Sequence, residues 1–181
     1  MDAKKGCVIW LTGLPGSGKT SIARALEKEI KKLDHKVEVL DGDEVRKWLS
    51  PEVGFTREDR ERHLRRVAHV ARLLARNGVI VICSFVSPYR SIRREIRNIV
   101  ESDDIQFLEV FVRCSLEECI RRDPKGLYRK ALRGEIKHMT GLDDPYEEPE
   151  KPVLILDAEN RSAEENAQIL LKKLRELNIL A

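Results

Sequence analysis

Five short apolar runs are spread along the chain and predict five β-strands. They span residues 6–12, 36–40, 79–83, 107–112 and 153–156. One of them, VIVIC at 79–83, lacks polar alternation, as is typical of a strand that is covered on both faces of a parallel sheet. The predicted sheet therefore draws its strands from almost the whole length of the chain.

Between these runs, apolar residues recur at the three- and four-residue spacing of amphipathic helices. The clearest stripe follows the T-x-x-D capping pattern of Thr56 and Asp59, and it ends at Asn77 and Gly78. Its members are Leu64, Val67, Ala68, Ala71, Leu74 and Ala75. Further helices are predicted over residues 17–32, 44–49, 88–101, 115–122 and 162–177.

Strands that alternate with helices in this way predict an α/β fold, with a mainly parallel five-stranded sheet inside a three-layer α/β/α arrangement. The length of 181 residues indicates one domain over residues 1–181. Residues 124–152 are interrupted by glycines and prolines and are too long for an ordinary connector, so we expect a mobile lid there. In such folds ligands bind beyond the carboxyl ends of the strands.

A phosphate-binding motif lies between the first predicted strand and helix. Its sequence, GLPGSGKT at 13–20, satisfies GxxxxGK[ST] in the strand, loop and helix context that the motif requires. The expected ATP-binding residues are Gly13, Leu14, Pro15, Gly16, Ser17, Gly18, Lys19 and Thr20. Backbone amides cradle the phosphates, Lys19 reaches the β and γ phosphates, and Thr20 can ligate Mg²⁺. The motif predicts a P-loop NTPase fold, which kinases, hydrolases and nucleotide switches share.

Two aspartates follow the second predicted strand, at the edge of the sheet where the phosphates are expected. Asp41 can hold Mg²⁺ or its waters, and Asp43 can accept the proton of an attacking hydroxyl. The alternative is an Asx-type turn that only joins the strand to the next helix.

Basic residues cluster after these aspartates. A guanidinium suits an anionic substrate because it binds two oxygens at once, and Arg46 and Arg60 are the candidates, with a solvated surface position as the alternative. Phe55 precedes the predicted cap Thr56, so it either stacks on a base or forms a hydrophobic staple. Ser87, in the loop after the third strand, either contacts the acceptor or caps the next helix.

Composition narrows the classes of partner. With 34 Lys and Arg against 31 Asp and Glu, the formal charge of +3 gives no argument for nucleic acid or membrane binding, and neither is expected. The four cysteines show no CxxC pair, so buried thiols are expected. The segment 1–6 is short and polar, which does not match a signal peptide. No apolar run approaches the ~20 residues that cross a bilayer, so we expect a cytoplasmic protein.

Taken together, these motifs resemble the adenylyl-sulfate kinase family, whose members transfer the γ-phosphoryl group of ATP to the 3′-hydroxyl of adenylyl sulfate. Besides GLPGSGKT, the resemblance rests on LDGDEVR at 40–46, GFTREDR at 54–60 and SFVSPYR at 84–90. Its most specific part is the lid stretch RDPKGLYRKALRGEIKHMTGLDDPYEEP at 122–149. It implies ATP and adenylyl sulfate as substrates in sulfate assimilation, Mg²⁺ as the cofactor, and a homodimer.

The resemblance also implies roles for single residues. Asp43 would lie near the substrate hydroxyl, Phe55 would stack on the adenine of adenylyl sulfate, and Lys125, with the arginines at 121 and 122, would descend with the lid to meet phosphate charge. The catalytic residues it implies are Asp43, Lys19 and Ser87. The substrate-binding residues it implies are Asp41, Asp43, Arg46, Phe55, Arg60, His63, Val86, Ser87, Lys125 and Met139.

Ser87 matches a serine described in the family as a phosphoserine intermediate. Phosphoryl transfer demands mainly in-line positioning and charge stabilisation, so a role in the substrate loop suits Ser87 better than a covalent step.

Three positions depart from the family pattern. Glu44 and His63 stand where asparagine is common, and Met139 stands where a second aromatic side chain usually helps to sandwich the adenine. A methionine can pack against a purine through its polarizable thioether but offers no ring. For His63 the alternative is a partly exposed helix histidine. The remaining functions are a P-loop kinase for another hydroxylated metabolite or nucleoside and a non-enzymatic nucleotide switch.

Overall fold

The computed structural model describes residues 6–181, which form five strands and seven helices. The strands are β1 (Cys7–Thr12), β2 (Val37–Asp41), β3 (Ile80–Ser84), β4 (Gln106–Arg113) and β5 (Leu154–Asp157). The helices are α1 (Lys19–Lys32), α2 (Gly42–Leu49), α3 (Arg57–Arg76), α4 (Arg90–Glu101), α5 (Leu116–Arg122), α6 (Leu127–Leu132) and α7 (Ala163–Glu176). Every predicted strand and helix is present, with ends shifted by a residue or two; only α6, inside the expected lid, was not predicted.

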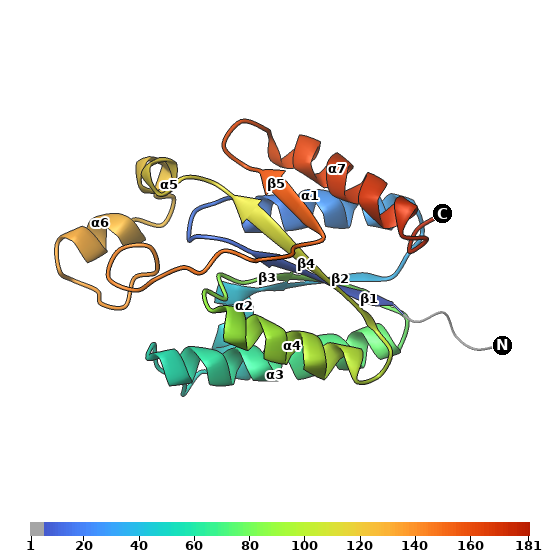
Figure 1. Cartoon of the computed structure of the whole chain (residues 1–181), viewed down its shortest axis with the longest axis horizontal. Helices are drawn as coiled ribbons and strands as arrows, with labels where there is room; N and C mark the ends of the chain where they lie inside the picture. Colours follow the sequence, from blue (N-terminus) through green and yellow to red (C-terminus); the bar gives the residue numbers. More distant parts are fainter. Residues whose placement is uncertain (1–5) are drawn as a thin grey trace.

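All five strands are parallel, in the spatial order β2-β3-β1-β4-β5. Helices α1 and α7 cover one face of the sheet, and α3 and α4 cover the other (Figure 1). The predicted three-layer α/β/α arrangement is confirmed. Because β1 lies between β3 and β4, the loop that follows it opens at the middle of the sheet's carboxyl edge, where α5 and α6 project beyond the strands (Figure 1).

The central strand explains why its sequence is apolar without alternation. Ile9 and Leu11 point into the core cluster with α1 and α7, whereas Val8 and Trp10 point into the cluster with α3 and α4. Trp10 stacks on Phe85, with ring centroids 5.3 Å apart. A strand that is buried on both faces therefore fixes the phosphate-binding motif at its end to the most rigid part of the fold.

The expectations on the cysteines and on membrane-spanning segments can be compared with the described residues. All four cysteines are buried free thiols, as expected. Within the described part of the chain, no helix is long and apolar enough to cross a membrane. The prediction from the polar start of the chain concerns residues 1–6, of which only Gly6 is described.

The core packing gives a stability prediction. Leu26 in α1 is fully buried, so we expect Leu26→Ala to lower the free energy of unfolding by ~2–5 kcal/mol, because it removes apolar contacts and leaves a cavity. Leu73→Ala, at an exposed position of α3, is the matched control and should stay within ~0.5 kcal/mol of the parent. Urea unfolding would measure both, and equal losses would contradict the described core.

Candidate active site

The phosphate loop, residues 13–20, leads from the centre of the sheet into α1. Gly18 precedes the helix with a φ of 100°, and a side chain on Gly13 would come within 2.5 Å of the Val112 carbonyl oxygen. Both positions need glycine, the first for its left-handed backbone and the second for its close approach to β4. The amides at the start of α1 are thereby left to face an anion.

Lys19 is folded onto this loop. Its Nζ donates to the carbonyl oxygens of Gly13 at 3.0 Å and Leu14 at 2.8 Å. Burial lowers the pKa of Lys19 to about 8, so this lysine is still protonated in most molecules at neutral pH. The ammonium group therefore lies beside the loop, and its hydrogen-bond partners there are neutral carbonyl oxygens.

Thr20 and Asp41 bring two oxygen ligands together at the next strand. The Thr20 hydroxyl donates to Asp41 Oδ2 at 2.6 Å and lies 3.4 Å from Ser84 Oγ. Oxygen donors of this kind suit Mg²⁺, which is usually held by one or two side chains and the substrate phosphates. Among residues 6–181 no group of three or more His, Cys, Asp or Glu could hold a metal.

Asp41 also accepts a hydrogen bond from the Asp43 amide through Oδ1, at 3.2 Å, and so caps α2. The Asx-type turn is therefore present, and the other oxygen of the same carboxylate accepts from Thr20. The Asp43 side chain is exposed and forms an ion pair with Lys125 at the root of the expected lid. The candidate base and the lid lysine are thus neighbours.

Arg46 lies one helical turn beyond Asp43. Its Nη2 donates to the Val53 and Gly54 carbonyl oxygens, and its guanidinium carbon lies 4.3 Å from the centre of the Phe55 ring. Phe55 is 66% exposed, so the alternative of a hydrophobic staple is wrong; the position in α3 that such a staple would use is Arg60, which is not apolar. The Arg46 guanidinium covers part of the ring, and the rest of the side chain is open to solvent.

Arg60 connects α3 to the lid and to the loop after β3. It donates to Thr140 Oγ1 at 3.2 Å and to Tyr89 Oη at 3.3 Å, and it pairs with Asp144 Oδ2 at 2.5 Å. The solvated-surface alternative is wrong for this arginine. The fork already binds oxygens from two segments, as an anion-binding group would.

His63 and Met139 are both buried. His63 is 4% exposed, so the alternative of a partly exposed histidine is wrong; its Nδ1 lies 2.8 Å from Ser50 Oγ, and its Nε2 has no partner. Met139 packs in the core cluster on the α1 face. Met139 is only 6% exposed, so a ligand ring can pack against it only if its neighbours move.

Ser87 does not offer a free hydroxyl. It is 2% exposed, and its Oγ accepts from Trp10 Nε1 at 3.0 Å and donates to the Phe85 carbonyl oxygen at 3.1 Å. The neighbouring Val86 is half-buried, and its carbonyl oxygen accepts from the Thr12 hydroxyl at 2.7 Å. This geometry does not support the catalytic role expected for Ser87; its hydroxyl holds the loop in shape.

A cleft beside the phosphate loop was not predicted from the sequence. Its volume is about 230 Å³, and it is lined by Ser17, Gly18, Ser21, Ile22, Arg122, Ala158, Arg161, Ala163 and Asn166. Arg122 was expected to descend with the lid, but its Nη2 donates to the Ala158 carbonyl oxygen at 2.9 Å. The available signal was the polar turn after the last strand, which lies at the same edge of the sheet as the phosphate loop.

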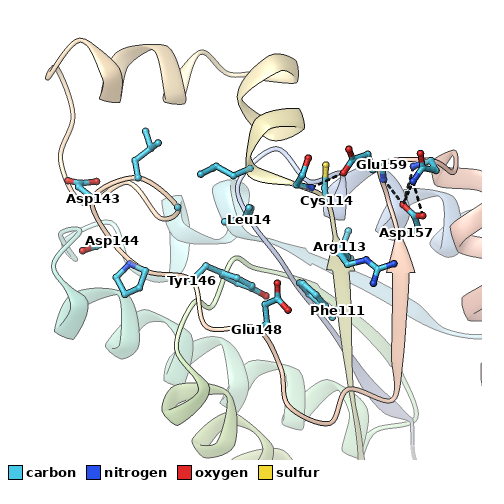
Figure 2. A pocket seen from close by; sticks show the side chains of 17 residues that line it. Leu14, Phe111, Arg113, Cys114, Asp143, Asp144, Tyr146, Glu148, Asp157 and Glu159 are labelled. Carbon is cyan, nitrogen blue, oxygen red and sulfur yellow. Dashed lines mark hydrogen bonds between the residues drawn. The ribbon is translucent and has the colours of Figure 1, made fainter.

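A second, larger cavity has a volume of about 780 Å³. Figure 2 shows Asp143 and Asp144 along the lid side of it, Asp157 and Glu159 beyond β5, and Tyr146 between them. Leu14 of the phosphate loop also lines it. Asp43, Arg46, Phe55 and Arg60 do not line this cavity, although Asp144, the ion-pair partner of Arg60, does.

The buried histidine predicts a pH dependence. Burial, with Arg46 and Arg66 nearby, lowers the pKa of His63 to about 4, below its ordinary value of 6.5. The unfolded chain therefore binds this proton first, and the free energy of unfolding should fall as the pH drops through the window from 6.5 to about 4. Urea unfolding at several pH values would show a shallower fall for His63→Gln. The exposed His69→Gln is the control, and identical curves for the parent and His63→Gln would contradict the buried neutral ring.

Comparison with known proteins assigns this arrangement to a family. The family model described as adenylylsulphate kinase matches residues 5–157. A probable adenylyl-sulfate kinase of Aeropyrum pernix is 60% identical over 167 residues, which cover 92% of this chain and 91% of that protein. The adenylyl-sulfate kinase of Myxococcus xanthus is 48% identical over 180 residues, covering 99% and 97%.

A solved structure extends the likeness to three dimensions. The Mycobacterium tuberculosis APS kinase CysC, in complex with AMPPNP and APS, matches with a TM-score of 0.92 and 43% identity. The match covers 94% of this chain and 98% of that chain. Since the family model covers most of the chain and the relatives match over nearly their full length, the chain belongs to the adenylylsulphate kinase family.

Proposed function

We propose that this chain transfers the γ-phosphoryl group of ATP to the 3′-hydroxyl of adenylyl sulfate, giving 3′-phosphoadenylyl sulfate and ADP in sulfate assimilation. The observation that carries the proposal is the 2.6 Å hydrogen bond from Thr20 to Asp41, which sets the carboxylates after β2 directly beside the phosphate loop. Membership of the family supports the same reaction, and the M. tuberculosis relative is described in complex with both AMPPNP and APS.

ATP occupies the phosphate loop and the smaller cleft in this proposal. The triphosphate lies along residues 13–20, where Lys19 exchanges its two carbonyl partners for phosphate oxygens. The nucleoside lies in the cleft beside Ser21, where the planar guanidinium of Arg122 is held by its hydrogen bond to the Ala158 carbonyl oxygen in the turn after β5. Thr20 and Asp41 would hold Mg²⁺, which when bound neutralises charge on the phosphates.

Adenylyl sulfate occupies the β2 side of the loop. Phe55 offers an exposed ring to its adenine, and the guanidinium groups of Arg46 and Arg60 face its anionic groups. His63, Val86 and Met139 form the wall of this site in the proposal. Arg60 reaches the acceptor by giving up its pair with Asp144, so acceptor binding and lid position are linked.

Asp43 acts as the general base. Its carboxylate accepts the proton of the 3′-hydroxyl while that oxygen bonds to the γ-phosphorus, and the bond from that phosphorus to the bridging β-oxygen breaks to release ADP. Lys125, paired with Asp43 before the reaction, turns to the developing phosphate charge as residues 124–152 close as a lid and exclude water. Ser87 shapes the loop and forms no covalent intermediate in this scheme.

We also propose a homodimer, on the basis of the family resemblance. Size-exclusion chromatography with light scattering would measure the molar mass in solution and so distinguish one copy from two.

The acceptor and the base are tested in one assay. With ATP and Mg²⁺, consumption of ATP should depend on adenylyl sulfate, whereas dependence on another hydroxylated metabolite or nucleoside, or on none, would overturn the proposed reaction. Asp43→Asn should lower kcat by ~10²–10⁴-fold and leave the KM for ATP within about twofold, because it removes a proton acceptor but keeps the shape.

Lys19→Ala is the contrasting variant, since it should impair the use of ATP with every acceptor. Glu44→Gln, which is next to Asp43 and exposed, is the matched control and should keep its turnover. Full turnover in Asp43→Asn would remove this carboxylate from the mechanism.

A further inference from the structure

A buried arginine joins the two segments that flank the proposed acceptor site. These are the acceptor loop, residues 84–90, and the return segment of the lid, residues 144–148. Arg93 of α4 is 2% exposed, and its Nη1 donates to the Ser87 carbonyl oxygen at 2.6 Å. Its Nη2 donates to the Glu147 carbonyl oxygen at 2.5 Å. The two ends of one planar fork therefore hold backbone atoms that lie 60 positions apart in the sequence.

The charge of Arg93 is matched inside the protein. Its Nε lies 3.2 Å from Glu109 Oε2 on β4, and its guanidinium carbon lies 5.7 Å from the centre of the Tyr146 ring. A buried cation is costly unless it is paired and hydrogen-bonded, and Arg93 is both. Tyr146 lies over Phe111 at the wall of the larger cavity (Figure 2), with ring centroids 6.1 Å apart.

A second set of contacts joins the same two segments. The Glu147 amide donates to the Pro88 carbonyl oxygen at 2.7 Å, and the Glu147 carboxylate accepts from the Arg90 amide at 3.0 Å. Arg90 is the first residue of α4, whose N-cap residue Tyr89 makes no capping hydrogen bond with its own side chain. The lid's return segment thus supplies an acceptor for the start of this helix.

The acceptor loop needs such support. Ser87 has a φ of 42°, in the left-handed region that a residue other than glycine adopts only when its surroundings hold it there. Its hydroxyl is held by Trp10, and its carbonyl by Arg93.

We infer that Arg93 is a positioning residue, which holds the acceptor loop and the return segment of the lid in one fixed arrangement and so couples lid closure to the geometry of the acceptor site. This inference rests on the proposed function for its kinetic consequence. Lysine cannot replace the arginine, because a single ammonium group does not span two carbonyl oxygens and a carboxylate with a planar fork. Substrate contact is not required of Arg93.

Kinetics of Arg93→Lys give the first test. We expect the KM for adenylyl sulfate to rise at least about tenfold and the KM for ATP to stay within about twofold, because the phosphate loop keeps its contacts. The share of ATP hydrolysed without transfer should rise as well, since a loosely held lid admits water. Equal changes in both KM values, or a lower melting temperature with unchanged kinetics, would assign Arg93 a purely structural role.

Two further variants serve as a control and as an independent test. Arg94→Lys changes the exposed neighbour on the same helix and should match the parent. Glu147→Ala removes the carboxylate that accepts from the Arg90 amide, and it leaves no buried charge. We expect it to show the same selective rise in the KM for adenylyl sulfate. It therefore provides the test if Arg93→Lys folds poorly. A Glu147→Ala enzyme with parental kinetics would overturn the coupling.

Hydrogen exchange of the protein without substrates separates this inference from the proposed reaction. In Arg93→Lys and Glu147→Ala, the backbone N–H groups within residues 86–90 and 144–148, from which Pro88 and Pro145 are absent, should exchange faster together, while those of β1 and β3 keep their protection. This readout holds whichever acceptor the enzyme uses. Unchanged exchange in both segments, or a rise spread over the whole sheet, would overturn the inference.

Discussion

The parallel direction of the five strands is the constraint on which the rest of the molecule depends. It delivers the loops after β1, β2 and β3 to one edge of the sheet, so that Thr20, Asp41 and Ser84 meet although they are far apart in the sequence. The burial of β1 on both faces makes the centre of that edge rigid. A phosphate loop that begins there keeps its amides in place without help from a ligand.

Charged groups at this edge are already paired with one another. Asp43 pairs with Lys125, Arg60 pairs with Asp144, and Lys19 donates to carbonyl oxygens. In the proposed function each pair is exchanged for a bond to a substrate, so that binding replaces one set of contacts with another instead of burying bare charge. Two of these partners, Lys125 and Asp144, belong to residues 124–152. The pairing of charges at this edge of the sheet therefore depends on the position of the lid.

The fold was predictable because its signals are local. Apolar runs, the Thr56 and Asp59 capping pattern and the GLPGSGKT motif each depend on neighbouring residues, and the sheet, its layers and the phosphate loop were all predicted from them. What could not be predicted depends on contacts between distant segments. Neither the cleft at Arg122 and Ala158 nor the burial of Ser87 beneath Trp10 leaves a mark in any short window of sequence.

Trp10 has a practical consequence for spectroscopy. The chain has two tryptophans: Trp10, whose indole is fully buried and donates to Ser87, and Trp48, which is 58% exposed on α2. The environment of one indole is thus set by the acceptor loop, and that of the other by solvent. The blue-shifted fluorescence of Trp10 can therefore report on the conformation of the acceptor loop without any label. A soluble quencher would suppress the emission of the exposed Trp48 and leave that of Trp10.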